Sequence, residues 1–267
     1  MLWHFGEKAA NRSATAMDTA MPDYDFRSPR LYVPTALATG GIVPLEPPQA
    51  HYLTKVLRLH AGDRVLAFNG RDGEWSAELR TEGRRAAELI AREQTRPQTP
   101  AGDLQYLFAP LKHARLDYIV QKAVEMGVTR LQPVLTRHTQ VARINTGRMR
   151  ANAIEAAEQC GILSLPEIAE PAPLAAALAG SGDRLLVFCD EGAEVKDPVA
   201  ALAAASSAPG PLAVLIGPEG GFDAAERDAL LRLPRVVRIA LGPRILRADT
   251  AAVAALALVQ AVRGDWR

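Results

Sequence analysis

The chain is predicted to join a β-rich N-terminal unit to a larger α/β unit, in which a parallel sheet is flanked by helices. From residue 104 onward, short apolar runs alternate with helical patterns, as βαβ connections require. Before residue 97, strand patterns follow one another with a single helix among them. A length of 267 residues with 48% apolar residues suits two domains.

The N-terminal unit is predicted over residues 24–96, after a disordered tail or upstream start at 1–23. Its strands are expected at 31–33, 64–68, 74–79 and 86–91. The Asn-Gly-Arg-Asp-Gly run at 69–73 predicts a hairpin turn between the second and third strands. A helix over 48–59 has Leu53, Val56 and Leu57 on one apolar stripe. Residues 97–102 read as a linker, with proline at both ends of a short polar stretch.

The second unit, residues 103–267, carries the alternating pattern. Strands are expected at 104–109, 130–135, 184–188, 212–216 and 236–241, and helices at 113–126, 146–159 and 251–262. Alanine-rich stretches at 171–179 and 198–208 predict peripheral helices and connections. The expected architecture is a helix-covered parallel sheet.

Two glycine-bearing turns are the most informative segments. Leu-Ile-Gly-Pro-Glu-Gly-Gly-Phe at 215–222 and Leu-Gly-Pro-Arg-Ile-Leu-Arg-Ala-Asp-Thr-Ala at 241–251 each follow a predicted strand. We expect them at the C-terminal ends of neighbouring strands, where open α/β sheets bind ligands. Neither matches a dinucleotide or triphosphate loop. The turns therefore predict a ligand held by backbone groups and apolar contacts, such as an adenosine with a short polar tail.

The charge is uneven along the chain. Residues 111–150 contain eight Lys or Arg against Asp117 and Glu125, which is +6 and leaves −5 for the remainder of a chain with net charge +1. This surplus predicts a polyanionic partner, with solvated helix faces as the alternative.

The cysteines and the apolar runs argue against several classes of protein. Cys160 and Cys189 form no metal motif or disulfide framework, so we expect two small buried residues in a reducing cytosol and no metal. No apolar run reaches the roughly 20 residues of a membrane span. The first 20 residues lack the apolar core of a signal peptide.

Together the two glycine turns closely resemble the signature of the RsmE family. Segments 51–58, 121–128 and 155–161 are similar to the same family, and the resemblance covers the chain from about Tyr24 onward. It implies a SPOUT-class methyltransferase that methylates N3 of a uridine in 16S ribosomal RNA of the small subunit. It also implies a PUA-like RNA-binding barrel, a trefoil knot that binds S-adenosylmethionine, a homodimer and a cytoplasmic location.

The resemblance implies a set of cofactor contacts. These are Gly217, Glu219, Gly220, Gly221, Leu241, Gly242, Ile245, Leu246, Arg247 and Thr250. A third loop at 189–191 is expected to close the pocket.

Catalytic roles follow from the chemistry of uracil, whose N3 is a poor nucleophile until its proton leaves. Arg247, and second Arg244, are candidates for stabilising the negative charge on the uracil carbonyls. The alternative is a phosphate contact or an ion pair with Asp249. Glu219 is a candidate proton acceptor, or else it caps the next helix. Asp249 and Thr250 are predicted to form the N-cap of the last helix.

Six basic side chains are predicted to contact RNA phosphates, with plain solvation as the alternative. They are His51, Lys55 and Arg58 in the first unit and Lys112, Arg115 and Lys122 in the second. Two positions depart from the family: Ile162 stands where arginine is common, and Asp249 where glutamate is common. Two rival functions stay open, a SPOUT ribose 2′-O-methyltransferase and a non-catalytic ribosome-assembly factor that binds RNA.

Overall fold

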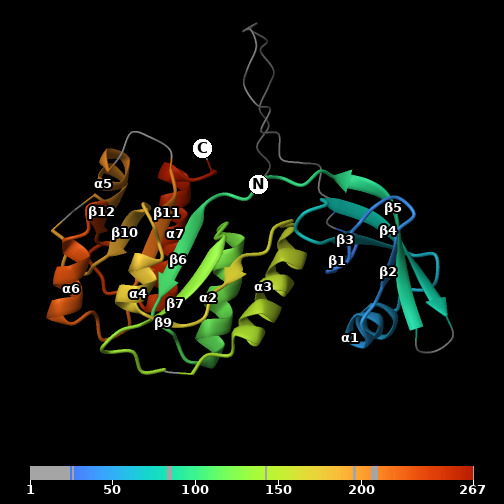
Figure 1. Ribbon diagram of the computed structural model, residues 1–267, viewed down its shortest axis with the longest axis horizontal. Coiled ribbons are helices and arrows are strands. Elements are labelled where there is room, and N and C mark those ends of the chain that lie inside the picture. The colour runs from blue at the N-terminus through green and yellow to red at the C-terminus, as the bar shows by residue number, and fades with distance from the viewer. Residues whose placement is uncertain are drawn as a thin grey trace, which may run out of the picture.

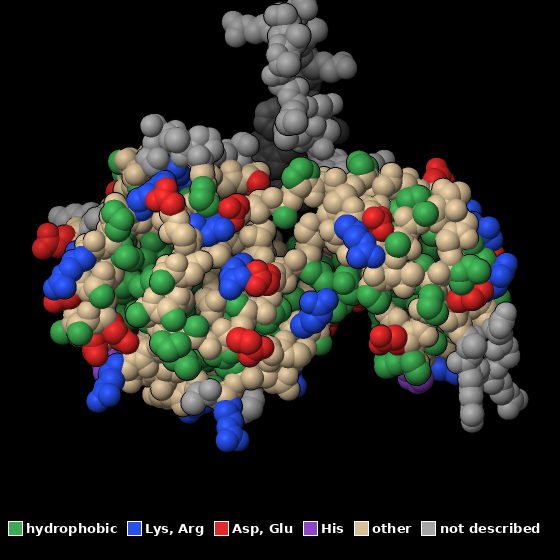
Figure 2. Space-filling view, viewed as in Figure 1, with side chains coloured by type: hydrophobic (Ala, Val, Ile, Leu, Met, Phe, Trp, Pro, Cys, Tyr) green, Lys and Arg blue, Asp and Glu red, His purple; other side chains and the backbone are tan. Residues whose placement is uncertain are grey.

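The computed structural model of the protein describes residues 25, 27–82, 86–141, 143–194, 197–205 and 210–266. The chain forms a β-rich lobe and a larger α/β lobe (Figure 1). A space-filling view shows the two lobes in contact above an open notch (Figure 2). The tail predicted over 1–23 lies outside the described residues, and the predicted domain limits stay a prediction.

The β-rich lobe is a five-stranded sheet in the order β1-β3-β4-β5-β2. β1 runs parallel to β3, and the other pairs are antiparallel. The strands are β1 (Arg30–Tyr32), β2 (Ile42–Pro44), β3 (Arg64–Phe68), β4 (Glu74–Glu82) and β5 (Ala86–Arg96). All four predicted strands are confirmed. The sequence analysis missed β2, because three residues that end in proline are too short to show alternation.

The single helix predicted over 48–59 is wrong in detail. An α-helix, α1 (Pro47–His51), continues as a π-helical turn, η1 (Tyr52–Val56). A π turn closes i→i+5 hydrogen bonds, so it rotates later side chains off an α-helical stripe. Leu53 is buried as predicted, whereas Val56 is 58% exposed.

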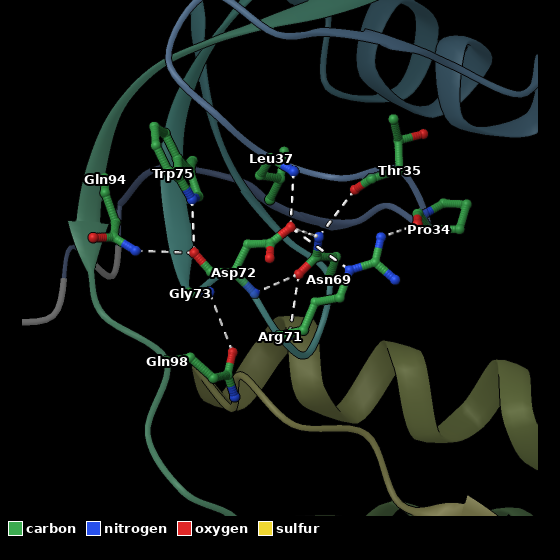
Figure 3. Close-up of polar contacts among 10 residues, drawn as sticks. All are labelled: Pro34, Thr35, Leu37, Asn69, Arg71, Asp72, Gly73, Trp75, Gln94 and Gln98. Atoms are coloured by element: carbon green, nitrogen blue, oxygen red, sulfur yellow. Dashed lines mark hydrogen bonds and ion pairs between the residues drawn. The ribbon is translucent and has the colours of Figure 1, made fainter.

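The predicted hairpin turn joins β3 to β4 and is held by its own side chains (Figure 3). Asn69 Oδ1 accepts the N–H groups of Arg71 and Asp72, at 3.1 and 2.9 Å. The Asp72 carboxylate accepts the N–H of Leu37 at 2.9 Å, which is the main reason its pKa is lowered. The turn therefore also fixes the segment that follows β1.

The α/β lobe contains a parallel sheet in the order β12-β10-β11-β6-β7-β8, and β9 pairs with β7. The strands are β6 (Leu104–Phe108), β7 (Arg130–Leu135), β8 (Glu167–Ile168), β9 (Ala172–Pro173), β10 (Leu185–Cys189), β11 (Leu212–Ile216) and β12 (Val236–Ile239). The predicted parallel sheet is confirmed.

Helices cover both faces of this sheet. They are α2 (His113–Glu125), α3 (Thr146–Cys160), α4 (Leu174–Ala179), α5 (Pro198–Ala204), α6 (Ala224–Leu231) and α7 (Ala248–Arg263). Residues of α2, α3, α5 and α7 share one core cluster, and residues of α4 and α6 share another. Along β11, Val214 packs into the first cluster and Leu215 into the second. Burial on both faces explains why the strand is a continuous apolar run.

The two glycine turns do not follow neighbouring strands, and that prediction is wrong. β10 lies between β11 and β12 and pairs with both in parallel. The connection from β11 through α6 to β12 skips one strand, a topology that local patterns do not encode. The loop after β10 consequently lies between the two glycine turns.

The two lobes meet at a seam, defined here as Arg30, Glu74, Arg96, Tyr32 and Glu158. The Glu74 carboxylate pairs with both Arg30 and Arg96 and is 4% exposed. Burial raises the pKa of Glu74, but the Arg96 hydrogen bonds and the two positive charges outweigh it and lower the pKa overall. This ion cluster joins three strands of the β-rich lobe.

Two hydrogen bonds of the seam connect the β-rich lobe to α3 and to the residue that ends it. The Tyr32 N–H donates to the Glu158 carboxylate at 2.8 Å, and Arg96 donates to the carbonyl of Gly161 at 3.0 Å. Cys160, expected to be buried, is exposed at this end of α3. Its pKa is nevertheless raised, first by partial burial and then by the charge of Glu125 on α2.

Candidate active site

The loops that follow β10, β11 and β12, with the first turn of α7, line a cavity of about 410 Å³, called here the donor pocket. Most predicted cofactor contacts line it: Gly217, Glu219, Gly221, Leu241, Gly242, Ile245, Leu246 and Arg247. Gly220 and Thr250 do not line it. The third loop, residues 189–191, lines it as predicted. Parallel strands place all three loops at the same edge of the sheet.

Glycine is required at the start of the first turn. A Cβ on Gly217 would lie 2.6 Å from the Phe222 ring, which itself packs edge-on against Phe188. Gly221 adopts φ 69°, a conformation that favours glycine. Gly220 points elsewhere, because its Cβ would lie 3.3 Å from His138, outside the donor pocket. The turn therefore presents backbone to the pocket on one side and contacts His138 on the other.

Asp190 fixes the loop that follows β10. It is buried and accepts hydrogen bonds from Arg227 and Arg238, each at 2.9 Å, and from the N–H of Gly192 at 3.0 Å. Burial raises the pKa of Asp190, but the Gly192 N–H and the two arginines outweigh it and lower the pKa overall. Sequence reasoning missed Arg227 and Arg238, since they reach Asp190 from α6 and β12.

The thiol of Cys189 also lines the donor pocket. Burial raises the pKa of this thiol to about 12. It stays protonated near neutral pH, so it contributes an apolar surface rather than a nucleophile.

Arg244 and Arg247 lie exposed at the rim of the donor pocket. Among the described residues neither forms an ion pair. Asp249 instead lies 3.9 Å from Arg115, so the predicted alternative of an Arg–Asp249 pair is wrong. Both arginines are therefore exposed, line the donor pocket and are accessible to a charged ligand group.

The predicted N-cap at Asp249 and Thr250 is also wrong. α7 begins at Ala248 and its N-cap is Arg247, whose backbone is extended at φ −65° and ψ 152°. Asp249 lies in the first turn, where a negative charge interacts favourably with the helix dipole. The helix starts before Asp249, because the backbone is already extended at Arg247 and turns helical from Ala248 onward.

Glu219 does not cap the following helix. Asp223 caps α6 in a capping box with Glu226. The Glu219 carboxylate instead accepts a hydrogen bond from Arg115 of α2. This pair stands between the donor pocket and a neighbouring cavity, because Glu219 lines both.

The predicted RNA contacts are divided among three places. Lys112 and Arg115 line the neighbouring cavity. Lys122 lies further along α2, where its hydrogen bond to Glu125 raises its pKa. The remaining three, His51, Lys55 and Arg58, are exposed around α1 in the other lobe. The fold therefore brings only Lys112 and Arg115 close to the donor pocket, in the cavity beside it.

The donor pocket fits a nucleoside with a polar tail. Its size lies in the usual range for small ligands, and it combines apolar side chains with glycine backbone. Within the described ranges, no group of three His, Cys, Asp or Glu side chains is placed to hold a metal ion. Among these same residues, no helix is long and apolar enough to cross a membrane.

A ligand pocket at one edge of a parallel sheet, in a chain that also carries a β-rich lobe, is the architecture that comparisons with known proteins assign to RNA methyltransferases. The family model "RNA methyltransferase domain" matches residues 97–260, and "RNA methyltransferase PUA domain" matches residues 45–91. The chain belongs to the ribosomal RNA small subunit methyltransferase E family, whose fold is of the SPOUT class. The trefoil knot implied by the resemblance stays a prediction.

The relatives support this membership over most of the chain. Ribosomal RNA small subunit methyltransferase E from Rickettsia conorii is 30% identical, covering 86% of this chain and 94% of the relative. The protein of that name from Bacillus subtilis is 27% identical, covering 81% and 90%. The solved structure of the Neisseria gonorrhoeae protein bound to S-adenosyl methionine has a TM-score of 0.79 and 28% identity, covering 90% of this chain and 100% of that one.

Proposed function

We propose that this protein transfers a methyl group from S-adenosylmethionine to N3 of a uridine in the 16S ribosomal RNA of the small subunit. The observation that carries the proposal is the donor pocket, built from three loops at one edge of a parallel sheet in a chain of the methyltransferase E family. S-adenosylmethionine, as the bound cofactor, supplies an electrophilic methyl group. The rRNA substrate places this activity in the cytoplasm.

The residues of the pocket suit that cofactor. Backbone groups of the turns around Gly217 and Gly242 bind an adenine without a pyrophosphate clamp, and Leu241 and Leu246 supply apolar contacts. In this proposal Arg247, with Arg244 beside it, stabilises the negative charge that uracil carbonyls gain when N3 is deprotonated. Their exposure at the pocket rim supports the role, since nothing in the described chain neutralises them.

We further propose that the two units are residues 24–96 and 103–267, joined by 97–102, and that both contact RNA. The exposed His51, Lys55 and Arg58 on the β-rich lobe support phosphate contacts there, and Lys112 and Arg115 support them near the donor pocket. Lys122 is the weakest of the six candidates because Glu125 already neutralises it.

A homodimer is part of the proposal. Ile245 lies at the rim of the donor pocket and is 93% exposed, so its aliphatic side chain is available for an apolar contact. A second copy packed over this rim would bury it and complete the pocket. Light scattering of the wild type and of Ile245→Asp tests this: we expect a dimer and a monomer, and a monomeric wild type would contradict it.

Nucleoside mass mapping of small-subunit rRNA, from cells with and without the gene, tests the reaction. We expect one N3-methyluridine to disappear on deletion and to return with the wild-type gene. Loss of a 2′-O-methyl mark instead would support the ribose methyltransferase. Calorimetry with S-adenosylmethionine addresses the other rival, because an assembly factor without catalysis would show no binding at high cofactor concentration.

A further inference from the structure

A second cavity of about 470 Å³ lies beside the donor pocket. Pro218 and Glu219 line both cavities, so one short loop forms the wall between them. The rest of the second cavity comes from the segment before and at the start of α2 and from the loop after β7. A group bound there is next to the donor pocket.

The side chains of the second cavity suit a nucleotide. Lys112 and Arg115 bring positive charge, which binds phosphate. Leu111 and Val141 provide apolar surface for a base, and Gln140 provides hydrogen-bonding groups. Such a mixture is typical of sites that hold a splayed-out RNA base.

His138 occupies a special position in this cavity. Its Nδ1 lies 3.1 Å from the carbonyl oxygen of Gly220 and 3.2 Å from that of Gly221. Carbonyl oxygens only accept hydrogen bonds, so Nδ1 carries the hydrogen. In the neutral ring Nε2 then holds a lone pair, and within the described part of the chain no hydrogen bond occupies it. His138 thus couples the glycine turn of the donor pocket to a free acceptor in the second cavity.

We propose that the second cavity receives the acceptor uridine and that His138 Nε2 removes the proton from uracil N3. The proposal rests on the proposed function and adds the residue that activates the acceptor. The N3–H bonding pair stays on N3 and the proton forms a bond to Nε2, which yields an imidazolium. The Gly220 and Gly221 carbonyls stabilise that cation through Nδ1–H, and the proton is then released to water.

Glu219 is less suited to this step, because Arg115 already engages its carboxylate. The charged groups around His138 are Lys112, Arg115 and Glu219 in the cavity, with Arg137 next in sequence and Glu226 bound to the Arg137 N–H. These groups comprise three positive and two negative side chains.

His138→Gln tests the proposal, because an amide N–H can still donate to the glycine carbonyls but cannot take the proton. We expect wild-type affinity for S-adenosylmethionine by calorimetry and a fall of about 100-fold or more in single-turnover methyl transfer at pH 7. The wild-type rate should fall in acid as the ring becomes protonated. The variant should lack that acid limb and gain rate steadily toward alkaline pH, where N3 ionises without help.

A readout without the cofactor uses ¹⁵N NMR of the histidine ring. Adding a short uridine-containing RNA should shift the His138 Nε2 resonance, and the same RNA without uridine should shift it less. Lys112→Ala should weaken RNA affinity several-fold, because it removes a positive charge that lines the second cavity. Arg232→Ala, an exposed cation at the C-cap of α6, should change neither RNA affinity nor the single-turnover rate.

The outcomes separate this proposal from the proposed function. A His138→Gln variant with the wild-type rate and pH profile would overturn the role of His138 while N3 methylation stands. An unshifted His138 resonance on RNA binding would overturn the placement of the uridine. A wild type that binds the cofactor but methylates no N3 would instead reject the proposed function.

Discussion

The seam between the lobes and the rim of the donor pocket both depend on arginine, but in opposite ways. At the seam, Arg30 and Arg96 enclose a Glu74 side chain that is 4% exposed. At the rim, Arg244 and Arg247 are exposed and form no ion pair with any described residue. Buried charges need partners, so the seam arginines maintain the fold. Exposed arginines without ion-pair partners lower the stability of the fold little, because water solvates them, and they remain available to a ligand.

The largest expected effect tests the structural side of this comparison. Glu74→Gln leaves two arginine charges at a buried site, so we expect the free energy of unfolding to fall by about 3–5 kcal/mol. Glu78→Gln is the control, since its pair with Arg92 is partly exposed and should cost about 1 kcal/mol or less. Urea denaturation measures the free energy of unfolding of both variants. Equal losses in the two would contradict the distinction between buried and exposed ion pairs.

The rim should behave in the opposite way. Arg247→Ala removes charge stabilisation of the reacting base, so we expect kcat/KM to fall about 100- to 1,000-fold, with stability unchanged within about 0.5 kcal/mol. Arg244→Ala should cause a smaller loss. Kinetics with an rRNA fragment and thermal melts measure the two properties, and a destabilised Arg247→Ala would show that this arginine also supports the fold.

Gly217→Val sharpens the comparison inside the donor pocket. The new Cβ would overlap the Phe222 ring, so we expect overpacking to cost about 1–3 kcal/mol, seen as weaker S-adenosylmethionine binding and a lower melting temperature. Gly102→Val is a suitable control, because no atom lies within 4 Å of its Cβ position. Calorimetry on both variants checks this, and unchanged binding in Gly217→Val would mean that the turn does not shape the pocket.

The smallest effect concerns Glu158 at the seam. Burial, followed by the charge of Glu155, raises the pKa of Glu158 despite the Tyr32 hydrogen bond. A raised pKa in the folded state means that the protonated form is favoured there. The contribution of Glu158 to the stability of the fold is therefore present below the ordinary pKa of glutamate and is lost as the pH rises through the raised pKa. Glu158→Gln should abolish this loss and be slightly more stable at pH 7, as denaturant titrations across pH can show. A variant with the wild-type pH dependence would contradict it.

Much of the fold was predictable because its signals are local. The runs at β3, β7 and β11 have the predicted limits, and the Asn-Gly turn formed as expected. The predicted start of α3 agrees with the observed one, and its predicted end differs by one residue, since Gly161 in a left-handed conformation terminates the helix. Failures occurred where a local pattern competed with tertiary packing, as in the π turn that exposes Val56.

The donor pocket was predictable in part for the same reason. The two glycine turns carry their own conformational requirements, so their residues point to a backbone-lined site. Asp190, Arg227 and Arg238 left no local signal, because each belongs to a different element. The role proposed for His138 likewise depends on two carbonyls more than 80 residues away in sequence.

The sequence by itself determined most of the strands and helices, the glycine turns and the family. Short-range rules, such as periodicity, capping and the backbone freedom of glycine, are written in neighbouring residues. Only the tertiary structure decided the strand order, the placement of β10 between the two turns and which arginines are paired. Those features depend on contacts between distant segments, whose energies become visible only when the chain is packed.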